Sequence, residues 1–356
     1  MKIGLLYSSQ KQNEKRYPLH WKHLIKLTPN LLKKIIFEEG YPGIENLNQN
    51  YVRTAKRQEI FKLVNLVVLP KPVKDDYHYF QTNQIVWGWP HAVQTPAIVD
   101  VAIEKKLTLI AWEHMYAWNQ DVKGKHIFAR NNEIAGYASV IHALTLAGIT
   151  AGAYGNHKKI AVIGYGSTGK GAITALLGLG AEKVSVYSRR SKAQIAVNNP
   201  QLEFKKYQAK NSHVLMEGKN AFTELAEYDI IVNCILQNPL KPKMFMSTTQ
   251  ALSLQKPLLI IDVSCDAGMG FEFAQPTSFT QPQFHVGHVT YYGVDHSPSF
   301  FFEAASFEIS KVLFPHLLFV LENNTYRGNS VLEKAIDIEQ GQIINKEIIS
   351  FQQRNV

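Results

Sequence analysis

The sequence predicts an α/β protein built from two Rossmann-like, doubly wound parallel-sheet domains separated by a cleft. At 356 residues, the chain is too long for one ordinary hydrophobic core. Short apolar, β-branched runs alternate along it with segments of helical spacing, which is typical of parallel α/β folds. One such run, Ile160–Ile163, leads directly into Gly164, Gly166 and Gly169, which have the spacing of a dinucleotide-binding turn.

The turn between this run and the expected helix Lys170–Leu179 has the features of a phosphate-binding loop. The first glycine permits the tight bend, the second lets phosphates approach the backbone, and the third lets the helix pack on the strand. Ser167 and Thr168 stand where free N–H groups at a helix N-terminus would face a pyrophosphate. Because glycines also mark ordinary turns, a turn without a nucleotide is the alternative.

The residues after the next expected strand, Val184–Tyr187, indicate which nicotinamide cofactor fits. The strand ends at about the distance from the glycines that the dinucleotide-binding fold requires. NAD-binding chains usually carry an acidic residue there, whereas this chain has Ser188, Arg189 and Arg190. A hydroxyl beside two guanidinium groups matches a 2′-phosphate. The sequence therefore predicts NADPH over NADH, and a solvated basic loop is the alternative.

The charge balance is basic, with 38 Lys and Arg against 29 Asp and Glu. The basic residues are scattered and no nucleic-acid-binding signature is present, so the charge favours anionic small ligands over nucleic acid. Cys234 and Cys265 lie in apolar runs without metal-ligand spacing, which indicates buried free thiols in a reducing compartment and no metal site. Met1–Ser8 lacks signal-peptide features, and no apolar run is expected to span a membrane, so we expect a cytoplasmic protein.

The N-terminal part of the chain alternates strands and helices. Met1–Ser8 should form a first strand, and Trp21–Glu39 has helical spacing that is interrupted at Pro29 and ended by Gly40. Further elements are expected as strands at Leu63–Leu69, Gln84–Trp87 and Leu107–Trp112, and as a helix at Thr95–Lys106.

Three side chains near the ends of these strands are candidates for chemistry. Arg16 could hold a substrate carboxylate, although on sequence alone a surface charge is the more ordinary interpretation. Lys71 lies between two prolines, which could fix the direction of a functional amine but would also flank an ordinary exposed lysine. His91 follows Trp89, and an imidazole beside an apolar wall suits acid–base work, whereas a hydrogen-bonded structural histidine is commoner.

The second half of the chain continues the alternation and then returns to the first domain. A crossover helix is expected at Asn131–Ile149, strands at Tyr228–Ile235, Pro257–Ser264 and Val289–Val294, and a returning helix at Phe301–Leu321. These crossings predict a discontinuous substrate domain, residues 1–132 and 300–356, and an NADPH-binding domain, residues 133–299. Because ligands bind at the carboxyl ends of parallel strands, Asp266 should face the nicotinamide end of the cofactor.

Taken together, the segments resemble the superfamily of alanine dehydrogenase, transhydrogenase and saccharopine dehydrogenase, and within it the opine-forming enzymes. The likeness covers nearly the whole chain. It is carried, beside the glycine loop, by NEKRYPL, LPKP, WGWPHA, IAWEHMYAW, NNEIAGYASVIHAL, DVSCDAGMGFEFA and VDHSPSFFFEAASFEIS. The resemblance implies a reductive condensation, in which an amine and an α-keto acid form an imine and NADPH delivers hydride to its carbon. In the opine branch, the implied substrates are pyruvate and the side-chain amino group of ornithine or, less readily, lysine.

The resemblance also implies a role for each candidate residue and a homo-oligomeric assembly. The family's carboxylate-binding arginine falls on Arg16, its lysine and histidine beside the keto carbon on Lys71 and His91, and its aspartate near the nicotinamide on Asp266. Lys71 or His91 would donate a proton as the carbonyl oxygen leaves as water, and the sequence does not distinguish them. Arg16 would orient the pyruvate carboxylate, and Asp266 would position the cofactor ribose or a water molecule.

The chain departs from the alanine dehydrogenase pattern at two places. A proline directly follows Lys71 where an acid is usual, and Asp295 and His296 stand where an asparagine is common. Both differences favour the opine branch. The alternatives are an alanine- or saccharopine-type amino-acid dehydrogenase and a catalytically silent NADPH-binding regulator. On charge alone, Glu113, Asp295 or Glu303 could bind the cationic amine substrate.

Overall fold

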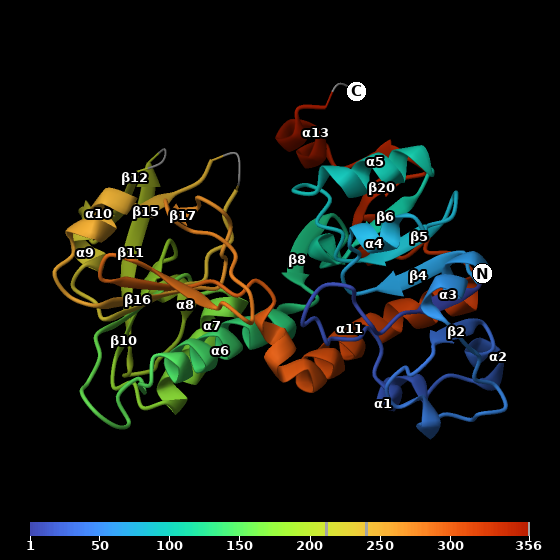
Figure 1. The fold of residues 1–356 in the computed structure, drawn as a ribbon, viewed down its shortest axis with the longest axis horizontal. Coiled ribbons are helices and arrows are strands. Elements are labelled where there is room, and N and C mark those ends of the chain that lie inside the picture. Colours follow the sequence, from blue (N-terminus) through green and yellow to red (C-terminus); the bar gives the residue numbers. More distant parts are fainter. Residues whose placement is uncertain (211–212, 239–240, 355–356) are drawn as a thin grey trace. The chain divides into compact units, whose positions relative to one another are not determined.

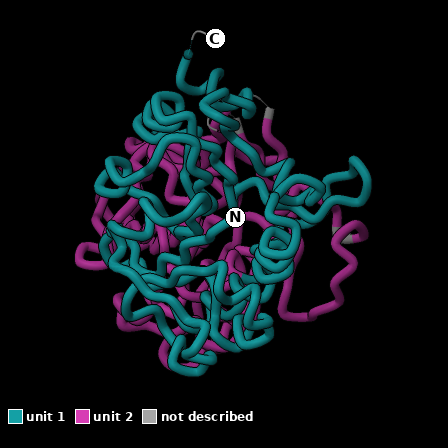
Figure 2. Tube along the Cα trace, turned by 90° about the vertical axis from the view of Figure 1, so that its right-hand side faces the viewer, with its two compact units in different colours: residues 1–130, 302–356 teal, residues 131–301 magenta. Residues whose placement is uncertain are grey.

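The computed structural model describes residues 1–210, 213–238 and 241–354. The chain divides into two compact units, residues 1–130 with 302–356 (unit 1) and residues 131–301 (unit 2), as Figures 1 and 2 show. Each limit lies two residues from the domain limit expected from the sequence. The two units are described separately below.

Unit 1 is built on a mostly parallel sheet. Its strands, in spatial order, are β3 (Thr54–Ala55), β2 (Ile35–Glu38), β1 (Ile3–Leu5), β4 (Leu66–Leu69), β5 (Ile85–Gly88), β6 (Thr108–Ala111), β20 (Ile336–Glu339) and β21 (Gln342–Ile343). Neighbours from β3 to β6 are parallel, whereas β20 and β21 are added antiparallel. The chain order reverses between β1 and β4, which is the topological switch point of a doubly wound fold.

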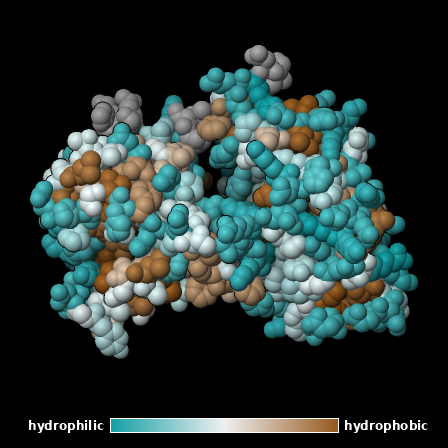
Figure 3. All heavy atoms as spheres, viewed as in Figure 1, coloured by the Kyte–Doolittle hydropathy of each residue, from teal (hydrophilic) through white to brown (hydrophobic). Residues whose placement is uncertain are grey.

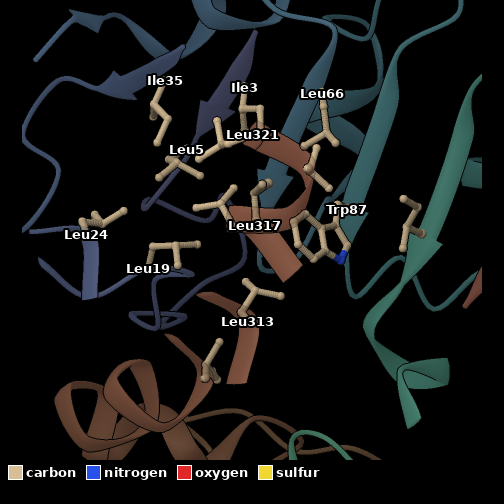
Figure 4. Close-up of a cluster of buried hydrophobic side chains, with 14 of the residues drawn as sticks. Ile3, Leu5, Leu19, Leu24, Ile35, Leu66, Trp87, Leu313, Leu317 and Leu321 are labelled. Carbon is tan, nitrogen blue, oxygen red and sulfur yellow. The ribbon is translucent and has the colours of Figure 1, made fainter. Parts of the chain in front are cut away.

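Helices cover both faces of this sheet. On one face, the labelled side chains of Leu313, Leu317 and Leu321 from α11 (Phe302–Asn323) pack in one cluster with Ile3 and Leu5 (Figure 4). On the other face, buried residues of α3 (Arg57–Leu63) and α5 (Pro96–Glu104) pack on the same strands. The shorter helices are α1 (Trp21–Leu24), α2 (Pro29–Leu32), η1 (Ile44–Asn46), α4 (Lys74–Tyr77), η2 (Trp112–His114), α12 (Ser330–Glu333) and α13 (Lys346–Gln352).

The central six strands of unit 2 have the same parallel arrangement as those of unit 1, and further strands are added at both edges of the sheet. Its strands, in spatial order, are β17 (Gly270–Phe271), β15 (Met244–Met246), β12 (His213–Met216), β11 (Leu202–Lys210), β10 (Val184–Ser188), β9 (Ile160–Ile163), β14 (Ile230–Asn233), β16 (Leu258–Asp262), β19 (Val289–Tyr292) and β18 (Gln283–Val286). The strands from β11 to β19 are parallel, and their order reverses between β9 and β14. The α/β fold class with parallel sheets is therefore confirmed.

The helices of unit 2 also lie on both faces of its sheet. α6 (Ala129–Leu146) and α7 (Ser167–Gly178) pack on one face, and α9 (Ala221–Leu225) and α10 (Thr248–Ser253) pack on the other. The remaining helical segments are α8 (Lys192–Ile195) and η3 (Ser297–Phe301). The antiparallel strands β12, β13 (Lys219–Asn220) and β18 were not expected from the sequence.

The helix expected over Trp21–Glu39 is wrong in its second half. Two short helices, α1 and α2, precede a strand, β2, which pairs in parallel with β1. Helical and strand spacing cannot be told apart in a short apolar run. The β-branched and aromatic residues Ile35, Ile36 and Phe37 are buried in the sheet, and such residues favour a strand when a pairing partner is present.

The exposed hairpin of β7 (Tyr116–Asn119) and β8 (Val122–His126) was also not expected.

One helical run of the described residues, Ser297–Asn323, is long and apolar enough to cross a membrane by length and composition. The prediction that no apolar run is long enough to span a membrane is therefore wrong. Half of its apolar window is buried, and the run includes α11, whose leucines pack in the core of unit 1. It is a core helix of this unit. On the face drawn in Figure 3, hydrophobic residues form separate patches between hydrophilic ones.

Candidate functional site

Hydrogen bonds join the loops at the carboxyl edge of the unit 1 sheet. Across the switch point, the Ser9 hydroxyl after β1 donates to the carbonyl oxygen of Lys71 after β4 at 3.1 Å. The backbone N–H of Trp89 after β5 donates to the carbonyl oxygen of Pro70 at 3.0 Å. Ligands bind at this edge of doubly wound sheets. The structure thus places the half-buried Lys71 and the loop of His91 together at the edge where chemistry is expected.

Arg16 lies at the same edge but is buried, with 3% of its surface exposed. Its Nε donates to Glu14 Oε1 at 2.8 Å and a second guanidinium nitrogen donates to Oε2 at 2.5 Å. The guanidinium carbon lies 4.8 Å from the centre of the Trp89 ring. The interpretation of Arg16 as a surface charge is therefore wrong. A bidentate ion pair and an aromatic face hold its planar group in one orientation.

His91 is held by Glu113, which follows β6. The Glu113 Oε1 atom lies 2.8 Å from the backbone nitrogen of His91 and 3.1 Å from its ring Nδ1. The His91 side chain is 45% exposed, and its backbone has a φ of 47°, in the left-handed region. Such a backbone costs energy for a non-glycine residue and persists only when its surroundings fix it. Glu113 thus orients the ring and stabilises the loop.

The carboxyl group of Glu113 is electrostatically unusual. Its Oε2 atom is buried and finds no hydrogen-bond partner in the described part of the chain. Burial raises the pKa of Glu113 to about 7, and the charge of Asp337 adds to this, whereas the hydrogen bond from the His91 backbone and the charge of His114 oppose it. Glu113 was considered from sequence only as a cation-binding residue. Glu113 follows β6, and β6 pairs with β5, the strand that precedes the loop of His91; this neighbourhood is the signal that could have paired the two residues.

In unit 2, the three glycines have the geometry of a phosphate cradle. Gly164 follows β9 with a φ of +104°, which favours glycine. A Cβ built on Gly169 would lie 2.1 Å from the carbonyl oxygen of Gly164, so helix and loop meet too closely for a side chain. A Cβ on Gly166 meets nothing within 4 Å, so the space above it is open to a ligand. These residues fit the pyrophosphate of a dinucleotide.

Helix α7 begins at Ser167, three residues earlier than expected, with Gly166 as its N-cap. Ser167 and Thr168 therefore occupy the first turn, where backbone N–H groups have no partner within the helix. This placement agrees with the role in phosphate binding that the sequence predicts for them.

The arginines after β10 are both exposed, and each is anchored to a neighbouring element. The Arg190 guanidinium donates to the carbonyl oxygen of Tyr165, inside the glycine loop, at 2.5 Å. Arg189 makes a side-chain hydrogen bond with Tyr207 of β11. The buried hydroxyl of Ser188 accepts the backbone N–H of Arg190 at 3.1 Å. The structure thus brings Arg190 to the glycine loop and Arg189 to β11, and the two anchoring tyrosines were not predicted.

Hydrogen bonds to Asp262, the last residue of β16, hold the loop that carries Asp266. Asp262 Oδ1 accepts the backbone N–H of Cys265 at 3.0 Å and the side-chain amide of Asn233 at 2.9 Å, and Oδ2 accepts the Tyr291 hydroxyl at 3.0 Å. Burial raises the pKa of Asp262 to about 6 and also raises that of the half-buried Asp266. The loop after β16 is therefore a rigid support for Asp266.

Two further expectations concern cysteines and cation binding. Cys234 and Cys265 are both buried, and neither forms a disulfide within the described residues. Glu303 lies in unit 1 and both of its oxygens are in use, because Oε1 pairs with His20 Nε2 and Oε2 accepts the Tyr17 hydroxyl, each at 2.8 Å. Among residues 1–210, 213–238 and 241–354, no group of three or more His, Cys, Asp or Glu side chains is placed to hold a metal ion.

Comparisons with known proteins show which family the chain resembles. The family profile described as alanine dehydrogenase/PNT, C-terminal domain, matches residues 136–346. N(5)-(carboxyethyl)ornithine synthase of Clostridium botulinum is 27% identical over 89% of this chain and 94% of its own length. Alanine dehydrogenase 1 of Staphylococcus aureus is 22% identical over 96% of this chain and 94% of its own.

A solved structure of an L-alanine dehydrogenase superimposes with a TM-score of 0.76 at 19% identity, covering 99% of each chain. At this identity, the superposition shows only that the two chains share a fold. The profile match extends over more than half of the sequence. The chain therefore belongs to the alanine dehydrogenase/PNT family.

Proposed function

We propose that the protein is an NADPH-dependent opine-type dehydrogenase that condenses pyruvate with the side-chain amino group of ornithine or lysine. With ornithine, the product is N5-(carboxyethyl)ornithine. Membership of the family supports the coarser statement, a nicotinamide-nucleotide-dependent oxidoreductase of the amino-acid dehydrogenase type that acts on CH–NH groups. The relative at 27% identity supports the opine chemistry. The observation that carries the proposal is the gathering of Lys71, His91 and Arg16 at one edge of the unit 1 sheet.

In the proposed reaction, the amine attacks the keto carbon of pyruvate and water leaves, giving an imine. NADPH, when bound, supplies the hydride that reduces the imine carbon. Arg16 binds the pyruvate carboxylate with a group that Glu14 and Trp89 hold in place. Because the His91 Nδ1 faces Glu113, Nε2 is the ring atom that delivers a proton to the departing oxygen. Lys71 then supplies the positive charge that stabilises the developing oxyanion.

The preference for NADPH rests on the basic pair after β10. Arg190 reaches the glycine loop and Arg189 reaches β11, so both flank the end of the strand where the 2′-substituent of the ribose binds in this fold. Guanidinium groups bind a phosphate in bidentate fashion. The position of an acid that would select the 2′-hydroxyl is taken by Ser188.

The test is to incubate the protein and NADPH with pyruvate and, in turn, ornithine, lysine or ammonia, and to identify products by mass spectrometry. We expect NADPH oxidation and a carboxyethyl product with ornithine or lysine. Fast oxidation with ammonia and none with ornithine would instead assign an alanine-type activity, which the relative covering 96% of the chain supports as second candidate. In a parallel incubation with 2-oxoglutarate in place of pyruvate, reaction of lysine there alone would assign a saccharopine-type activity. Cofactor binding without turnover over the whole panel would indicate a silent regulator.

We further propose a homo-oligomer in the cytoplasm. The two buried cysteines, neither of which forms a disulfide within the described residues, agree with a reducing compartment. Light scattering of the purified protein measures the assembly, and a monomeric mass at micromolar concentration would contradict it.

A further inference from the structure

The segment at the C-terminal end of the described chain contacts the loop of His91. The side-chain nitrogen of Gln352, at the end of α13, donates to the carbonyl oxygens of Ala92 at 2.7 Å and Val93 at 3.0 Å. These are the two residues that follow His91. Gln352 lies 260 positions along the chain from Ala92, so this contact exists only in the folded unit 1.

The amide of Gln352 is itself held in one orientation. Arg354 Nε donates to its side-chain oxygen, which directs the NH₂ group towards the two carbonyl oxygens. Arg354 is anchored to α5, because its guanidinium pairs with Asp100 at 2.7 Å and donates to the carbonyl oxygen of Pro96 at 3.2 Å. The side-chain amide of Gln352 is therefore held by its own helix, α13, and, through Arg354, by α5.

Hydrogen bonds also connect the start of α13, through Asp337, to the loop that contains His114. Its N-cap residue, Asn345, donates a side-chain hydrogen bond to Asp337 Oδ1 at 2.9 Å, and the same oxygen lies 2.8 Å from His114 Nδ1. His114 directly follows Glu113. The C-terminal helix thus contacts the loop of His91 directly and is linked to the loop of Glu113 through Asp337.

His91 needs such support because of its backbone. Its φ of 47° is in the left-handed region, which costs on the order of 1–3 kcal/mol for a residue other than glycine. Within the loop, the backbone N–H of His91 donates to Glu113, and the carbonyl oxygen of His91 accepts the N–H of Gln94 at 3.1 Å. The two hydrogen bonds of Gln352 fix the peptide groups in between.

We propose that Gln352 is a positioning residue for His91, through which the C-terminal helix α13 sets the geometry of proton transfer. The inference rests on the proposed function, in which His91 delivers a proton to the departing oxygen. It assigns no direct contact with the substrate to Gln352. A misplacement of about 1 Å at a reacting group costs up to roughly a hundredfold in rate, so loss of the two hydrogen bonds should lower kcat.

The experiment compares Gln352→Met with Gln353→Met in the full chain. Both changes replace a glutamine amide by a thioether of similar length, but Gln353 is exposed. For Gln352→Met, we expect kcat with pyruvate and ornithine to fall about tenfold, with the KM for pyruvate and the affinity for NADPH unchanged. Gln352→Glu, which keeps an acceptor for Arg354 but turns a carboxylate towards two carbonyl oxygens, should lower kcat at least as much. Gln353→Met should match the wild type.

Hydrogen–deuterium exchange of the segment 88–95 gives a readout that does not depend on turnover. We expect faster exchange there in Gln352→Met and not in Gln353→Met. Unchanged exchange, or an unchanged kcat, would overturn the positioning role. A parallel fall of kcat, NADPH affinity and melting temperature would show a merely structural one. A wild-type protein without turnover on any substrate pair would instead overturn the proposed function.

Discussion

Glu113 Oε1 contacts one residue, His91, at two points: it accepts a hydrogen bond from the backbone N–H at 2.8 Å and lies 3.1 Å from the ring Nδ1. A single carboxylate oxygen therefore fixes both the loop and the imidazole. This arrangement makes the ring orientation, and with it the proton-donating atom, depend on the ionisation of Glu113.

The partly buried carboxyl group of Glu113 makes the free energy of unfolding depend on pH. The pKa of Glu113 is raised from 4.5 to about 7, so between these values the folded state keeps a proton that the unfolded chain has released. Its contribution to the free energy of unfolding therefore falls as pH rises from 4.5 to 7 and is constant above. Glu113→Gln removes the ionisable group and with it this pH-dependent contribution to the free energy of unfolding. The wild type should lose up to about 3 kcal/mol relative to the variant between pH 4.5 and 8.

Denaturant unfolding of both proteins at pH 5 and pH 8 measures the difference. A wild-type advantage that grows with pH would contradict the raised pKa.

Removal of the proton donor His91 or of the charge-stabilising Lys71 should greatly lower turnover without affecting cofactor binding. We expect His91→Asn and Lys71→Met each to lower kcat/KM for pyruvate by at least about a hundredfold, because proton transfer and charge stabilisation are lost. NADPH affinity, measured by fluorescence titration, should stay within about twofold, since the cofactor cradle lies in unit 2. Lys74→Met, at an exposed lysine of α4, is the matched control. Full activity of Lys71→Met would remove that residue from the mechanism.

The basic pair after β10 should select the phosphorylated cofactor. In the double variant Arg189→Ala with Arg190→Ala, the affinity for NADPH should fall by at least about a hundredfold, because two charge-assisted contacts of roughly 1.5–3 kcal/mol each are lost. NADH affinity should change little. Lys183→Ala, at the other end of the same strand, removes an exposed charge and should leave both affinities unchanged. An equal loss for both cofactors would refute a 2′-phosphate site.

Substitution by alanine at two glycines of the cradle should affect different properties, stability at Gly169 and NADPH affinity at Gly166. A Cβ on Gly169 meets the Gly164 carbonyl oxygen at 2.1 Å, so Gly169→Ala should destabilise the fold by about 1–3 kcal/mol. A Cβ on Gly166 enters open space, so Gly166→Ala should keep the melting temperature but lower NADPH affinity about tenfold or more, because the methyl group occupies the approach of the phosphates. Calorimetry and titration separate the two effects. Unimpaired NADPH binding by Gly166→Ala would argue against the cradle.

Much of the fold could be predicted from short-range patterns. The buried strands β9, β10 and β16 were found from apolar β-branched runs, because burial on both faces of a parallel sheet requires such residues. The segment Trp21–Glu39 shows where this reasoning ends. Its apolar residues fit either period, and only pairing with β1 makes Ile35–Glu38 a strand.

The site was predicted as a set of residues but not as an arrangement. Arg16 was interpreted as a surface charge on sequence alone, yet it is buried against Glu14 and Trp89. The resemblance to a known family supplied its expected role, and the chain's own pattern did not. Gln352 carried no signal at all, because a glutamine in a terminal helix is an ordinary surface residue.

By itself, the sequence determined the class of fold, the glycine cradle and the basic pair beside it, since each depends on residues that are close together in the chain and obey local steric and electrostatic rules. Only the tertiary structure decided which side chains surround His91. Its partners, Glu113 and Gln352, come from other elements, and they meet it because parallel strands end at one edge and the chain returns to that edge after leaving unit 1.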